Sequence, residues 1–200
     1  MKKNIYLTVL LLLIWNNGLF ALKNDTILVK SPHQISFEAG YRNIFSQIDR
    51  SVNPWINTAK HGVGGMIDYG WKVSGLNGKK PAVYLTIPLG YHVMYASNEE
   101  SSNVSMLSYG WTVRHELFRQ HSKVTPFVGY GLLLNTLKKQ GVEGSVMGHQ
   151  TQFELGTNFN TSGKLIYFAK VAYSYSSYPK IGDSKRIHLQ YFDLKLGVRF

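Results

Sequence analysis

The feature that most constrains this chain is an alternation of apolar and polar residues that recurs along most of its length. In residues 83–95 every second residue is apolar or aromatic, and the same period returns in 165–175 and 192–200. Successive side chains of a β-strand point to opposite faces, so a period of two predicts strands whose two faces meet different surroundings. The chain is therefore expected to be all-β.

Eight segments carry this alternation, and together they predict a barrel that crosses a membrane. They are residues 34–42, 62–73, 82–95, 104–117, 125–135, 148–159, 164–175 and 188–200. All eight are longer than the roughly five or six residues typical of soluble sheets, and each reaches the about 9–11 residues that a tilted membrane-spanning strand needs. Eight is also the smallest common strand number of a closed transmembrane barrel. We therefore predict an eight-stranded antiparallel transmembrane β-barrel over residues 22–200.

The connections predict which way the barrel faces. Short turns are expected at 74–81, 118–124 and 160–163, and longer loops at 43–61, 96–103, 136–147 and 176–187. Outer-membrane barrels have short periplasmic turns and longer extracellular loops. Both termini are therefore predicted to be periplasmic, with residues 22–33 as a short lead-in.

The first 21 residues have the layout of a secretory signal peptide. Two lysines precede a short apolar run, and Ala21 is a possible cleavage position, although cleavage after Gly18 also fits. An uncleaved membrane anchor is the alternative. Export makes nucleic acid an improbable partner, although 22 Lys and Arg stand against 11 Asp and Glu.

The two faces of the predicted strands differ in chemistry. One face carries aromatic residues near strand ends, as expected for the bilayer interface: Tyr41, Tyr69, Trp71, Tyr91, Tyr95, Tyr109, Trp111, Tyr173 and Tyr175. The other carries charges between glycines, as expected for a narrow interior: Glu38, Arg42, Asp68, Lys72, Arg114, Glu116, Glu154, Lys170, Asp193, Lys195 and Arg199. Alternation alone would also fit a soluble, lipocalin-like exported barrel; strand length and aromatics favour the membrane.

Two segments resemble a known family. Residues 188–200, which end on Phe200, look like the closing strand of bacterial outer-membrane proteins, and residues 125–131 resemble a mid-barrel strand of the small outer-membrane β-barrel superfamily. The mature chain is similar in pattern to that superfamily, with its OmpA-transmembrane, OmpX and OmpW-like members. The resemblance implies the outer membrane of a Gram-negative bacterium, contact with lipopolysaccharide, and recognition of Phe200 by the barrel-assembly machinery.

The charged interior allows two interpretations. It could be a narrow pore for small solutes, or a plug of ion pairs, because eight strands enclose about enough room for side chains alone. Buried charges must pair, and five acids against six bases nearly balance. We therefore favour the plug.

Enzymatic and metal chemistry have little support. Some small outer-membrane barrels are lipid A deacylases that use a lipid-facing serine and histidine; here His115 and His149 fall on the expected lipid face, but neither has a serine two residues away. No histidine spacing indicates a metal site, and no cofactor is expected.

The outer loops are the expected place for a binding function. Phe45 and Trp55 in the first loop could contact an extracellular protein or ligand, and Lys180, Lys185 and Arg186 in the last could pair with lipopolysaccharide phosphates. The sequence therefore predicts a non-enzymatic outer-membrane protein, envelope-structural or partner-binding. A passive channel is the alternative, and a lipid A-modifying enzyme the third possibility.

Overall fold

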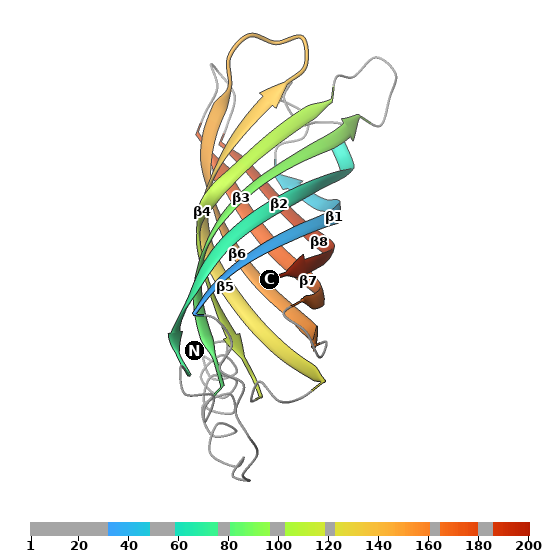
Figure 1. Ribbon diagram of the computed structural model, residues 1–200. Coiled ribbons are helices and arrows are strands. Elements are labelled where there is room, and N and C mark those ends of the chain that lie inside the picture. Colours follow the sequence, from blue (N-terminus) through green and yellow to red (C-terminus); the bar gives the residue numbers. More distant parts are fainter. Residues whose placement is uncertain are drawn as a thin grey trace, which may run out of the picture.

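The computed structural model confirms an all-β chain closed into a barrel. It describes residues 32–48, 59–75, 81–96, 103–118, 123–160, 165–179 and 186–200. The strands in this part of the chain are β1 (His33–Ile48), β2 (Ala59–Ser74), β3 (Val83–Ala96), β4 (Val104–Glu116), β5 (Val124–Lys139), β6 (Val146–Asn160), β7 (Ile166–Tyr178) and β8 (Ile187–Arg199). Each pairs antiparallel with its neighbours in sequence, and β8 pairs with β1 (Figure 1). The predicted eight-stranded antiparallel barrel is therefore confirmed; the expected signal peptide lies outside the described residues.

The seam between β1 and β8 is fully hydrogen-bonded at the end of the chain. The Phe200 amide donates to the Ile35 carbonyl at 2.9 Å, and the Ile35 amide donates back to the Phe200 carbonyl at 3.3 Å. Following paired residues around the barrel from Glu38 leads back to β1 near Ile48, an offset of roughly ten residues. An offset of this kind tilts the strands, as Figure 1 shows. No helix among the described residues has the length and apolarity needed to span a membrane.

The two ends of the barrel carry different connections. We call the end with His33 and Phe200 the terminal end, where residues 75–82, 117–123 and 161–165 connect strands. We call the other the loop end, where 49–58, 97–103, 140–145 and 179–186 connect them. Figure 1 shows the β5–β6 hairpin rising farthest at the loop end.

Several strands are longer than predicted, and one residue that was predicted in a loop therefore lies in a strand. β1, β2 and β5 continue into the predicted outer loops, so the two sets of connections differ less in length than expected. Phe45, expected in the first loop, lies in β1 on the outer face, 5.0 Å from the ring of Phe192 and 6.2 Å from that of Tyr173. Pairing with β8 extends the strand because it satisfies backbone groups that a loop would leave to water.

Glycines make room for the bulky charges inside the barrel. A Cβ at Gly129 would lie 2.6 Å from the Glu154 side chain, and one at Gly40 would lie 2.6 Å from that of Lys195. Each glycine faces the longer side chain on a paired strand. At these positions a glycine on one strand leaves the space that a long side chain on the paired strand fills.

Candidate functional site

The eleven charged residues expected inside the barrel all lie there, each at most 7% exposed. Period-two alternation puts them on the inward face of every strand that carries them. The structure separates them into two layers along the barrel axis. We call these the middle layer and the terminal layer.

The middle layer is a network of direct ion pairs. Arg42 donates two hydrogen bonds to Asp193, at 2.7 and 2.9 Å. Glu38 accepts one contact from Lys170 at 2.8 Å and another from Lys195 at 2.9 Å. Three acids thus neutralise three bases, because Lys170 also lies 2.8 Å from the remaining acid, Glu154. Asp68 borders this layer and accepts a hydrogen bond from Ser36 at 3.3 Å.

The terminal layer is held by aromatic rings and one amide. Arg199 donates to Asn158 at 2.8 Å, and Asn158 donates to Glu116 at 3.1 Å. The guanidinium of Arg199 lies 4.7 Å from the ring centre of Phe168, and that of Arg114 lies 4.7 Å from that of Tyr84. Lys72 also faces Tyr84, at 5.7 Å.

A third set of polar groups, not singled out by the sequence analysis, lies above the middle layer. Gln150 accepts from Asn135 and from the Tyr191 hydroxyl, both at 2.7 Å, and donates to Ser174 at 2.9 Å. The ring of Tyr191 lies 4.0 Å from the Arg42 guanidinium and so joins this set to the charged network. These neutral residues share the inward period of the charges, which is the signal that could have found them.

Apolar side chains fill the interior at the loop end. This cluster, which we call the loop-end plug, comprises Ile44, Ala59, Met94, Val104, Met106, Leu137, Val146, Tyr178, Ile187, Leu189 and Tyr191. Met94, Met106, Leu137 and Leu189 have no exposed surface at all. In the described interior, buried hydrocarbon therefore fills the loop end and paired charges fill the middle.

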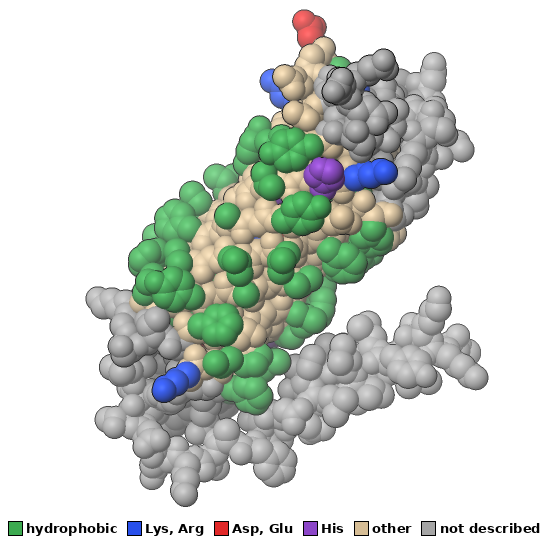
Figure 2. Space-filling view, turned by 90° about the vertical axis from the view of Figure 1, so that its right-hand side faces the viewer, with side chains coloured by type: hydrophobic (Ala, Val, Ile, Leu, Met, Phe, Trp, Pro, Cys, Tyr) green, Lys and Arg blue, Asp and Glu red, His purple; other side chains and the backbone are tan. Residues whose placement is uncertain are grey.

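The outer face is a band of hydrophobic side chains. Figure 2 shows these covering the barrel wall, with lysine or arginine side chains near both ends. Leu194 is 57% exposed and Leu196 is 65% exposed, values that water would penalise and lipid would not. All nine expected interface aromatics point outward: Tyr41, Tyr69, Tyr91, Tyr95, Trp111 and Tyr173 are exposed, and Trp71, Tyr109 and Tyr175 are half-buried. The expectation that they lie near strand ends is wrong for several of them, which stand in the middle of their strands: Tyr41, Tyr91, Tyr109, Trp111 and Tyr173.

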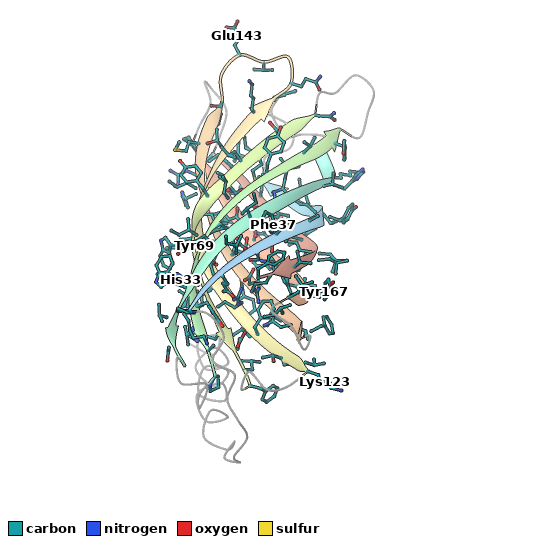
Figure 3. The ribbon with its side chains drawn as sticks, in the orientation of Figure 1. His33, Phe37, Tyr69, Lys123, Glu143 and Tyr167 are labelled. Carbon is teal, nitrogen blue, oxygen red and sulfur yellow. The ribbon has the colours of Figure 1, made fainter. Side chains whose placement is uncertain are left out.

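Histidines accompany several of these tyrosines. The Tyr69 hydroxyl lies 2.8 Å from Nδ1 of His33, and the Tyr175 hydroxyl lies 2.6 Å from Nδ1 of His188. Figure 3 shows His33 beside Tyr69 on the outside of the barrel. His115 stacks on Tyr130 with ring centres 5.9 Å apart, so this half-buried histidine belongs to the outer surface.

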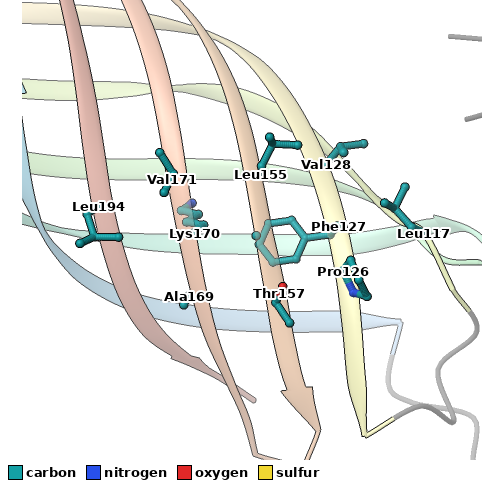
Figure 4. Close-up of a pocket in the computed structure, with 11 residues that line it drawn as sticks. Leu117, Pro126, Phe127, Val128, Leu155, Thr157, Ala169, Lys170, Val171 and Leu194 are labelled. Atoms are coloured by element: carbon teal, nitrogen blue, oxygen red, sulfur yellow. The ribbon is translucent and has the colours of Figure 1, made fainter. Parts of the chain in front are cut away.

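A hollow of about 400 Å³ interrupts the outer wall across β5 to β8 (Figure 4). Small outward side chains such as Ala169 and Thr157 lie between the bulkier Leu155, Val171 and Leu194. The lining of the hollow is mostly apolar, and the inward side chains of Phe127 and Lys170 also contribute to it.

The strand register brings together a serine and two histidines that are distant in sequence. Ser177 is directly opposite His149 on β6 and His188 on β8. Nδ1 of His188 is engaged by Tyr175, and within the described chain no three His, Asp or Glu side chains gather as a metal site would require. A serine nucleophile needs a base that a third group orients, and the tyrosine here is a weaker orienter than a carboxylate.

The residues expected to make loop contacts are only partly visible. Arg186 is exposed next to the start of β8. Trp55, Lys180 and Lys185 lie outside the described residues.

Comparisons with known proteins agree with this geometry at the level of the fold. No protein-family model and no curated protein matches the chain. Among solved structures, Neisserial surface protein A aligns at 17% identity with a TM-score of 0.62, over 84% of this chain and 96% of that one. The chain has the fold of the small outer-membrane β-barrels. Two other such barrels, both from Pseudomonas aeruginosa, align at 12% identity: the N-terminal domain of OprF (TM-score 0.48; 86% of this chain, 99% of that one) and OprG (0.49; 86% and 97%).

Proposed function

We propose that this protein is a non-enzymatic barrel of the bacterial outer membrane that serves envelope structure or binds a partner at its loop end. The observation that carries the proposal is the filled interior: a paired charge network below a loop-end plug whose central side chains have no exposed surface. A scaffold of this kind holds its connecting loops in fixed positions. The hydrophobic outer band supports residence in a bilayer.

The interior supports this proposal over the alternative of a passive channel. Eight strands leave a space about as wide as side chains alone can fill. We expect the purified barrel to produce no discrete current steps in a planar lipid bilayer. A matched variant, Met106→Ala with Tyr191→Ala, removes two side chains from the closed section and shows whether the assay detects an opened interior. Regular steps from the unmodified protein would overturn the proposal in favour of a channel.

The proposed orientation puts both termini in the periplasm and the β5–β6 hairpin outside the cell. The chain contains no cysteine, so single cysteines report on one position each. Glu143 stands at the tip of this hairpin, and Lys123 lies at the opposite end of the barrel (Figure 3). In intact cells a membrane-impermeant maleimide should label Glu143→Cys and leave Lys123→Cys unlabelled. The reverse pattern would contradict the orientation.

Lipid and lipopolysaccharide are the proposed surroundings of the outer face. The exposed Lys60, Lys138 and Arg186 near the loop end can pair with lipid phosphates. The non-enzymatic part of the proposal is tested by mass spectrometry of lipid A from cells with and without the protein. An altered acylation pattern that disappears in Ser177→Ala would replace the proposal by a lipid-modifying activity.

A further inference from the structure

The terminal layer differs from the middle layer in its charge balance. It contains Lys72, Arg114 and Arg199, whereas Glu116 is its acid. Counting Asp68 at its border, the described residues of this layer comprise three bases and two acids. Burying guanidinium groups is costly unless hydrogen-bond acceptors or an anion accompany them.

Buried hydrogen-bond donors in this layer have no partner. Nε and Nη2 of Arg114 and Nε of Arg199 are unpaired among the described residues, although the two side chains are only 4% and 2% exposed. Arginine can only donate, so these groups require an acceptor. Oε2 of Glu116 is unpaired as well, which offers one acceptor for three donor groups.

Both guanidiniums lie near one shared aromatic ring. The Cζ atoms of Arg114 and Arg199 lie 5.6 and 6.0 Å from the ring centre of the same residue, Phe127. Tyr84 and Phe168 each hold a second contact with one of them. An aromatic ring that lies over the face of a guanidinium leaves the N–H groups free to donate. These N–H groups point outward in the plane of the guanidinium itself.

We propose that the terminal layer binds one small inorganic anion between Arg114 and Arg199. Charge-assisted N–H contacts from two arginines are the chemistry by which proteins hold halide and phosphate ions. The proposal is independent of the function proposed above. A water molecule bridging Arg114 and Glu116 is the competing arrangement, and it would bring no anion dependence.

Crystals of the full barrel in sodium bromide give the direct test. We expect an anomalous bromide peak within hydrogen-bond distance of Arg114 and Arg199. A peak that persists in Arg114→Met, or no peak between the two arginines, would overturn the proposal.

A solution experiment keeps the proposal falsifiable if Arg114→Met does not fold. The unfolding temperature of the detergent-solubilised barrel is measured against chloride, bromide or phosphate, with ionic strength held constant by sodium gluconate. Stability should rise with the concentration of the bound anion. Glu116→Gln removes the competing negative charge and should tighten anion binding by about tenfold, whereas Arg114→Met should weaken it by about tenfold. Equal anion responses of the unmodified barrel and Glu116→Gln would overturn the proposal.

Discussion

Glu38→Gln should destabilise the barrel more than its small change in shape suggests. The Glu38 carboxylate contacts both Lys170 and Lys195, at 2.8 and 2.9 Å, and has no exposed surface. The amide keeps the volume and removes the charge. Breaking a buried ion pair by neutralising one partner costs about 3–5 kcal/mol, because the other charge stays buried.

The surroundings of the two lysines refine that magnitude. Lys170 keeps Glu154 at 2.8 Å, whereas Lys195 is left with Asp193 at 3.8 Å, and Arg42 already engages both oxygens of that carboxylate. The substitution therefore leaves only Lys195, and not Lys170, without a close carboxylate partner. We expect a loss near the lower bound, about 3 kcal/mol in the free energy of unfolding.

Urea unfolding in lipid vesicles, followed by tryptophan fluorescence and by heat-modifiable gel mobility, measures this loss. Adding Lys195→Met to Glu38→Gln removes the ammonium charge that lost its carboxylate partner. The double variant should recover about 1–2 kcal/mol of the free energy of unfolding. Glu143→Gln makes the same chemical change on an exposed hairpin and should stay within about 0.5 kcal/mol of the unmodified protein. If Glu38→Gln behaves like Glu143→Gln, the interior is wet and its ion pairs do not hold the barrel.

Three further changes test other parts of the structure. Leu194→Arg puts a charge on the lipid-facing band and should cost about 2–4 kcal/mol in vesicle unfolding; no loss would place this face in water. Gly156→Val should cost about 1–3 kcal/mol, because its side chain would meet the ring of Phe127, and Phe127→Leu in the same chain should restore part of the loss. Phe200→Ala should leave refolding in detergent close to normal but lower the amount of folded barrel in cell membranes, measured by gel mobility; equal reductions in both would mean that Phe200 matters for stability alone.

Alternation predicted the faces of the strands well, because each residue's face depends only on its position in the strand. It could not predict the strand ends, which depend on backbone pairing with a neighbour that is distant in sequence. Phe45 illustrates this: its segment is polar enough to suggest a loop, yet the residues on either side of it pair with β8 across a shift in register. Which interior charges pair with one another could not be predicted from the sequence either, because partners such as Arg42 and Asp193 are 151 residues apart.

The loop-end plug was missed for a different reason. Met94 and Met106 have the same inward parity as the buried polar residues His92 and Ser108. Where both faces of a strand end are apolar, the alternation of apolar and polar residues disappears. Inward apolar residues at such an end therefore cannot be recognised from alternation or from the positions of charged residues. Composition along the inward face, read strand by strand, is the signal that would have exposed the plug.

The chemistry of the interior side chains changes along the barrel axis, and the order of these sections opposes the passage of ions through the barrel. Among the described residues, hydrocarbon fills the loop end, balanced ion pairs occupy the middle, and bases outnumber acids near the terminal end. An ion crossing the barrel would have to break the middle network and then enter an apolar section, each step costing several kcal/mol. An anion in the terminal layer would therefore enter and leave by the terminal end, without crossing the barrel. A polar interior is therefore compatible with the non-conducting barrel proposed above, in which contacts with molecules beyond the loop end would depend on the outer surface and the loops.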